Sequence, residues 1–239
     1  MKRLLVCFLF SWNVFCVYGQ REAAGDVGAW LLILNHYKFN DRWKVGNELH
    51  VRRNDWLKEQ KQFLIRPYLN YHFGEGAILT IGYTYIRTSP FGATPLPLTV
   101  PENNIWEQLT LNHTYNKLII SHRYRIEHRF IGSPEQDNFG DYYIAGHRFE
   151  NRLRYRITAK REIDQNWFIH FFNEVWIHQE GLKPSSLDRN WLYTGFGYQV
   201  NDGVNFQLAY MHQWVKTGGE SYLKRPTIQM TFQYDMIKN

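Results

Sequence analysis

The feature of this sequence that most restricts its fold is a strict alternation of apolar and charged side chains, clearest in Leu118–Phe130. One set of alternate positions is apolar, aromatic or histidine, and the other carries three arginines and one glutamate between Arg123 and Arg129. A period of two places these sets on opposite faces of a β-strand. Burying three guanidinium groups in an ordinary hydrophobic core has a large desolvation cost. The charged face is instead expected to line the wet or salt-bridged lumen of a membrane β-barrel, with the other face toward lipid.

The same alternation returns along the rest of the chain and predicts eleven strands of roughly ten to thirteen residues. Tight turns and longer segments alternate between them, which is typical of outer-membrane barrels with short periplasmic turns and longer external loops. The predicted strands are Asp26–His36, Arg42–Arg53, Lys61–Phe73, Ala77–Thr88, Ile105–Tyr115, Leu118–Phe130, His147–Lys160, Asn166–His178, Trp191–Val200, Val204–Trp214 and Lys224–Met236.

The fold class that follows is all-β, a single antiparallel transmembrane β-barrel of about 10–12 strands. Eleven is odd, whereas bacterial single-chain barrels use an even number. Either Asp26–His36 does not span fully, which gives ten strands, or a further short strand exists, which gives twelve. Pro67 lies inside a predicted strand and lacks an N–H for the ladder, so a β-bulge is expected there.

The N-terminus has the pattern of a secretory signal peptide. A short basic region at Lys2 and Arg3 precedes the apolar run Leu4–Phe10, and Gly19 offers a small residue at a cleavage point. We therefore expect a signal peptide at residues 1–19 and an outer-membrane β-barrel at residues 20–239. Both cysteines lie in the leader, so neither disulfides nor thiolate metal sites are expected in the mature chain.

A soluble β-sandwich or a lipocalin-like barrel is the competing interpretation, because alternation alone does not show which face is inside. Strand length, the export signal and aromatic side chains near the predicted strand ends favour the membrane barrel, in which aromatics form belts at the two interfaces. Those aromatics are Trp43, Phe73, Trp106, Tyr115, Trp167, Trp191 and Trp214. The formal charge of +6 does not indicate nucleic-acid binding, since the basic residues are spread through the strands rather than gathered in one patch.

The charged phase supplies the candidate site. On the opposite phase these arginines would face lipid, where each costs about 2–4 kcal/mol at the membrane midplane. Two interpretations stay open: a salt-bridged network that fills a narrow barrel, or a narrow pore that favours anions because arginine exceeds glutamate. On the second, replacing Arg125 and Arg154 with Glu lowers or reverses anion preference. The candidate lumen residues are Arg66, Arg123, Arg125, Glu127, Arg129, Arg148, Glu150, Arg152, Arg154, Arg156 and Glu174.

Two further classes of function remain as alternatives. An outer-membrane lipid-modifying enzyme needs a nucleophile and a base within reach on the outer face, yet no His and Ser lie two apart on one strand. Four histidines, however, fall on the predicted outer phase. A binding or adhesion role would use the long loops, such as Ile131–Gly146 with its mixture of acidic and aromatic residues. No catalytic residue, cofactor or metal is assigned. The outer histidines are His113, His122, His128 and His212.

Several strand cores resemble an uncharacterised family of outer-membrane proteins, the domain-of-unknown-function family numbered 2490. The resemblance covers nearly the whole mature chain and implies a barrel in the bacterial cell outer membrane; it implies no activity. Independently of the resemblance, the membrane-barrel interpretation and the arginine-rich lumen lead us to expect outer-membrane lipid and small anionic solutes as partners. The residues that carry it are Arg66–Tyr71, Gly82–Tyr85, Arg125–Phe130, Arg152–Arg156, Phe172–Glu174, Gly195–Tyr198 and Tyr210–Gln213.

Overall fold

The computed structural model of the chain describes residues 23–24, 27–92, 95–179, 185–218 and 221–237, so the signal peptide expected at residues 1–19 lies outside the described residues. The strands assigned within these ranges are β1 (Ala23–Ala24), β2 (Gly28–Lys38), β3 (Trp43–Asn54), β4 (Glu59–Phe73), β5 (Ala77–Thr88), β6 (Val100–Tyr115), β7 (Leu118–Gln136), β8 (Tyr142–Glu162), β9 (Trp167–Gln179), β10 (Ser186–Asn201), β11 (Val204–Gly218) and β12 (Ser221–Ile237).

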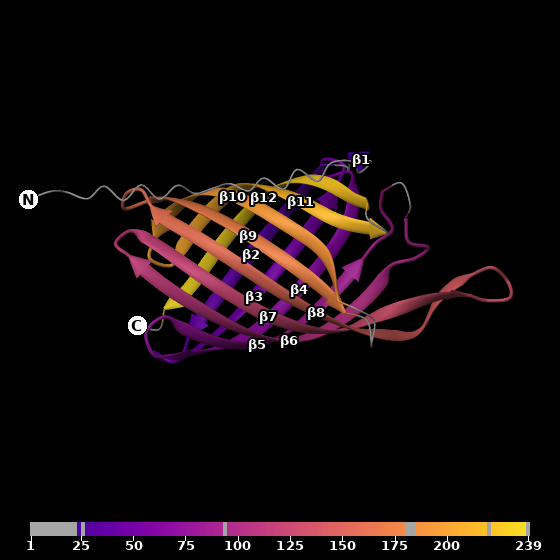
Figure 1. The fold of residues 1–239 in the computed structure, drawn as a ribbon, viewed down its shortest axis with the longest axis horizontal. Coiled ribbons are helices and arrows are strands. Elements are labelled where there is room, and N and C mark those ends of the chain that lie inside the picture. Colours follow the sequence, from indigo (N-terminus) through magenta and orange to yellow (C-terminus); the bar gives the residue numbers. More distant parts are fainter. Residues whose placement is uncertain (1–22, 25–26, 93–94, 180–184, 219–220, 238–239) are drawn as a thin grey trace, which may run out of the picture.

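The strands form one sheet that closes on itself (Figure 1). From β2 to β12 each strand pairs antiparallel with the next in the chain, and β12 then pairs with β2 in parallel. The two-residue strand β1 also lies parallel to β12. The result is a closed barrel of eleven long strands, which confirms the prediction of about 10–12. The further inference that an odd count must resolve to ten or twelve spanning strands is wrong. A parallel pair satisfies the backbone groups of both edge strands, so closure does not require an even number.

Side chains inside the barrel reinforce this parallel seam. The backbones of β2 and β12 stay in register from Gly28 opposite Thr227 to Lys38 opposite Ile237. Near the tight-turn end of the seam, Nδ1 of His36 on β2 lies 2.6 Å from a carboxylate oxygen of Asp235 on β12. Such a contact compensates in part for parallel pairing, which is slightly weaker per residue than antiparallel pairing.

All eleven predicted strands are present, but several extend further toward the long connections. The predicted loop Ile131–Gly146 is mostly a hairpin, because β7 and β8 continue to pair as far as Gln136 opposite Tyr142. In Figure 1 this hairpin projects well beyond the barrel wall. The apolar alternation stops near Phe130, whereas the backbone ladder needs no apolar side chains and continues.

The bulge expected at Pro67 is absent from the β4–β5 ladder. Ile65 pairs with Tyr85 and Tyr68 pairs with Gly82, so the register is the same on both sides of the proline. Pairing lapses between these positions without an inserted residue. The missing N–H therefore leaves a gap in the ladder and does not shift the strands.

The two faces of the wall differ as the alternation predicts. The outer face exposes large apolar side chains, and the charged side chains of the candidate site are mostly buried inside the barrel. In the part of the chain that the structure describes, no helix has the length and hydropathy needed to cross a membrane.

Candidate functional site in the barrel lumen

One buried carboxylate organises the middle of the lumen. Glu174 on β9 is fully buried and contacts arginines from two neighbouring strands. It accepts hydrogen bonds from Arg154 at 2.8 Å and Arg156 at 2.5 Å on β8, and from Arg123 on β7. Because β7, β8 and β9 pair in register, one period-two face brings these side chains together. Three guanidinium groups sharing one carboxylate leave a local excess of positive charge.

A second buried carboxylate lies one step further toward the long connections. Glu127 accepts a hydrogen bond from Arg152 at 2.6 Å and another from Arg154 at 2.6 Å. Arg125 is more distant, with a guanidinium nitrogen 3.8 Å from the carboxylate. Arg154 therefore bridges Glu127 and Glu174, so the two carboxylates belong to one network.

The network continues toward the long connections through Arg129. This guanidinium donates to both carboxylate oxygens of Glu102 at 2.8 Å and to Glu150 at 2.9 Å, and Glu150 also accepts from Arg148 at 2.7 Å. Glu102 was not among the predicted site residues. It continues the inward phase of β6, but its neighbour Pro101 made the segment read as a loop.

Arg66 lies on the other side of the lumen. It donates to Glu48 on β3 at 2.6 Å and to the Thr84 hydroxyl at 2.9 Å. His50 lies 3.0 Å from the same Glu48 carboxylate. All of the predicted lumen residues are thus brought into ion pairs or hydrogen bonds inside the barrel, and none lies on the outer face.

Aromatic rings pack against the guanidinium groups. Arg125 lies 3.9 Å from the ring centre of Trp106, Arg154 lies 3.7 Å from that of Trp176, and Arg52 lies 4.1 Å from that of Trp30. Cation–π contact is favourable for desolvated arginine. The expectation that Trp106 and Trp191 belong to interface belts is wrong, since both are buried in the lumen, 1% and 4% exposed.

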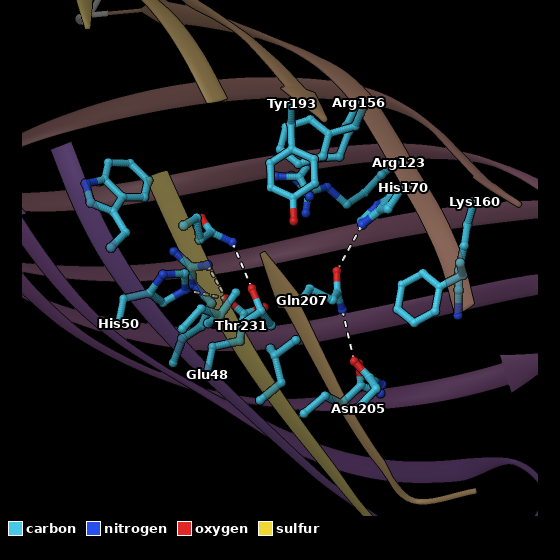
Figure 2. A pocket seen from close by; sticks show the side chains of 18 of the residues that line it. Glu48, His50, Arg123, Arg156, Lys160, His170, Tyr193, Asn205, Gln207 and Thr231 are labelled. Atoms are coloured by element: carbon cyan, nitrogen blue, oxygen red, sulfur yellow. Dashed lines mark hydrogen bonds and ion pairs between the residues drawn. The ribbon is translucent and has the colours of Figure 1, made fainter. Parts of the chain in front are cut away.

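A cavity of about 450 Å³ lies beside the network and reaches the tight turn between β10 and β11, where Asp202 and Gly203 line it. Its opposite wall is uncharged over most of its length, with amide and hydroxyl side chains from β11 and β12. In Figure 2, Gln207 points across the cavity to His170 at 3.3 Å and to Asn205 at 3.1 Å. The neutral wall consists of Asn205, Gln207, Gln229, Thr231 and Gln233.

The charges that line this cavity are unbalanced. Six cationic side chains line it against three carboxylates, with histidines counted as neutral. The cations are Arg52, Arg66, Arg123, Arg154, Arg156 and Lys160, and the carboxylates are Glu48, Asp202 and Asp235.

The buried polar atoms around the cavity without a hydrogen-bond partner among the described residues are all nitrogens. They are the indole nitrogens of Trp30 and Trp191, Nδ1 of His50, and Nε of Arg52 and Arg123. Indole and guanidinium N–H groups are donors only. These nitrogens are themselves buried, so their residues line the cavity through other atoms.

Neither a metal site nor a catalytic pair emerges from these contacts. Within the described residues, no group of three or more His, Cys, Asp and Glu side chains is arranged to hold a metal ion. On the outer face, His113 and His122 are neighbours, with ring centres 5.9 Å apart, and His122 is hydrogen-bonded to the Tyr155 hydroxyl at 2.9 Å.

Comparison with known proteins agrees with the fold. The model of the family described as "Protein of unknown function (DUF2490)" matches residues 27–224. A solved structure of the NanC porin shares 12% identity over 89% of this chain and 100% of that chain, with a TM-score of 0.52. The β domain of the Bordetella autotransporter Brka shares 12% identity over 80% and 82%, with a TM-score of 0.46. None of the curated proteins compared with the chain matches it.

Proposed function

For this chain, which belongs to the DUF2490 family of uncharacterised proteins, we propose the role of a narrow, anion-favouring channel of the bacterial outer membrane. Solute enters from the tight-turn end, into the cavity that reaches the β10–β11 turn. The candidate pore lining is the set of lumen arginines and glutamates. The fold of an outer-membrane barrel makes such a passage possible, while selectivity depends on the lining.

The observation that carries the proposal is the excess of positive side chains that line the cavity, six cations against three carboxylates. A positively charged lining favours negative solutes. A lumen that is only filled for stability would not need this excess, since paired charges suffice to fill it.

The Arg–Glu network sets the width of the passage in this proposal. Glu127 and Glu174 hold Arg123 of β7 and the β8 arginines Arg152 and Arg154 across the middle of the barrel, where tryptophan rings also pack. Charge-assisted hydrogen bonds of this kind are strong and directional. We therefore expect a small conductance, with the constriction at the network and a wider vestibule at the tight-turn end.

The test is the conductance of the purified protein in a planar bilayer under a potassium chloride gradient. We expect discrete steps and a reversal potential that indicates anion preference. The double variant R125E/R154E should lower or reverse that preference, and K58E, which makes the same type of change at an exposed turn, should not. A silent bilayer, with folding shown by altered migration of the unheated protein on a gel, would contradict the proposal and favour a filled barrel.

A further inference from the structure

A polar cluster on the outer face of the barrel is not explained by the lumen. His128 on β7 lies between Glu107 on β6 and Asn151 on β8. Its Nε2 is 3.1 Å from a carboxylate oxygen of Glu107, and its Nδ1 is 2.8 Å from the side-chain oxygen of Asn151. His128 was noted in the sequence as an outer-phase histidine, but its two partners were not identified there.

The cluster is surrounded by apolar side chains on the same outer face. On β7, Ile126 lies on one side of His128 and Phe130 on the other, and both are exposed. On β8, Asn151 lies between the exposed residues Phe149 and Leu153. The cluster therefore lies within the apolar outer surface and not at the polar rim of the barrel, where such residues are common.

Placing a carboxylate and an imidazole in this band has a cost. Polar groups that face hydrocarbon are unfavourable unless they are hydrogen-bonded, and ionisable residues at such positions usually mark function. Here the hydrogen bonds within the cluster leave one hydrogen-bond acceptor and one hydrogen-bond donor unsatisfied. The second carboxylate oxygen of Glu107 and the amide nitrogen of Asn151 make no hydrogen bond with the described residues. The cluster thus retains one strong acceptor and one donor at its surface.

A groove on the outer wall includes two members of the cluster, His128 and Asn151, and encloses about 370 Å³. Apolar atoms make up the larger part of its surface, from Ile126 on β7, Leu153 on β8 and Ile177 on β9. The remaining lining residues are Arg152, Gln179 and Ser185. A groove of this kind fits an alkyl chain.

We propose that this groove and the cluster Glu107–His128–Asn151 bind one lipid molecule whose acyl region carries a hydroxyl or amide group. A hydroxyl or an amide both donates and accepts, and so complements the free acceptor on Glu107 and the free donor on Asn151. An ester carbonyl only accepts, and therefore satisfies just one of the two. The adjoining groove holds the acyl chain. This site depends on the barrel lying in a membrane and is independent of ion passage through the lumen.

The experiment measures lipid retention. The protein is reconstituted in nanodiscs of phosphatidylcholine doped with lipid A, whose acyl chains bear hydroxyl and amide groups, and is then exchanged into detergent. Mass spectrometry counts the lipid A and phosphatidylcholine that remain bound. We expect the wild type to retain lipid A in preference. E107L should retain about tenfold less, since a hydrogen bond to a charged group is lost. H128F should also retain less, because the imidazole that holds Glu107 and Asn151 in place is removed.

H122F is the matched control, because His122 is also an outer-face histidine hydrogen-bonded to a neighbouring strand. It should retain lipid A like the wild type. If E107L does not fold, E107Q replaces it, since it keeps the shape of the side chain and removes its charge. E107Q should also retain less lipid A than the wild type. Unchanged retention in H128F, or equal retention of phosphatidylcholine by the wild type, overturns the proposal. A change of oligomeric state in H128F without a change in bound lipid assigns the cluster to a second copy of the chain instead.

Discussion

The lumen has two unlike walls. The charged wall, formed by β6 to β9, carries arginines and glutamates that contact one another across strands. The neutral wall, formed by β11 and β12, carries glutamine, asparagine and threonine, and the cavity lies along it. Long guanidinium side chains fixed by buried carboxylates reach into the lumen and fill it, while shorter amides leave space. The two walls therefore differ in how far they fill the lumen, and in the proposed channel the charged wall forms the constriction.

The largest effect should come from the charged wall. E174Q removes the carboxylate shared by three arginines, and losing one partner of a buried ion pair typically costs about 3–5 kcal/mol. We expect a marked fall in the urea concentration at which the barrel unfolds. Q207L on the neutral wall should have a much smaller effect. Equal losses in the two variants would show that the walls do not differ in their contribution to stability.

R156Q tests the charged wall with less damage to the fold. Arg156 lines the cavity and is the most exposed of the arginines bound to Glu174, so its replacement leaves two partners in place. Anion preference should fall because a positive charge next to the cavity is lost. The reversal potential under a salt gradient measures it. No shift in that potential would mean that permeating ions do not sense this wall.

Q229E places a carboxylate on the neutral wall, facing the same cavity. Because the side chain keeps nearly the same size, the unfolding midpoint should change little, while anion preference should decrease by less than in R156Q. Bilayer recordings of both variants at one salt gradient provide the comparison. A larger loss of preference in Q229E would place the selective region at the neutral wall.

The smallest effect is expected outside both walls, at the turn between β8 and β9. The backbone N–H groups of Asn166 and Trp167 donate to the Asp164 carboxylate, and these hydrogen bonds hold its pKa below the ordinary value. The folded pKa is lower than the unfolded one, so this stabilisation is present above about pH 4 and is lost as the pH falls through the folded value.

D164N should remove this pH dependence while keeping the turn. Asn40 already occupies the corresponding position between β2 and β3, where its side-chain oxygen accepts from the N–H groups of Arg42 and Trp43 at 2.9 Å. Unfolding midpoints of wild type and variant, measured at neutral and acidic pH, should converge as the pH falls. A constant difference between them would exclude the carboxylate as the source.

Much of this architecture could be predicted from the sequence, because period two is a property of the strand itself. Alternation located all eleven long strands and separated the arginines of β7 and β8 from the apolar face. The resemblance to the family followed the same strand cores and agrees with the match over residues 27–224.

The rest depended on neighbours that a single strand does not specify. Trp106 and Trp191 alternate like interface aromatics, but guanidinium groups from other strands make the lumen a favourable place for them. Glu102 was hidden by the proline beside it, and the partners of His128 come from two other strands. Pairing across the sheet decides such positions.

The parallel seam also determines which side of the membrane each end of the barrel domain faces. Strands β2 and β12 run in the same direction, both starting at the long connections and ending at the tight turns. The start of β2 at Gly28 and the end of β12 at Ile237 therefore lie at opposite mouths of the barrel. Epitopes inserted at these two points would lie in different compartments. An antibody should detect the one at the long-connection mouth on whole cells, and the one at the tight-turn mouth only after the cells are opened.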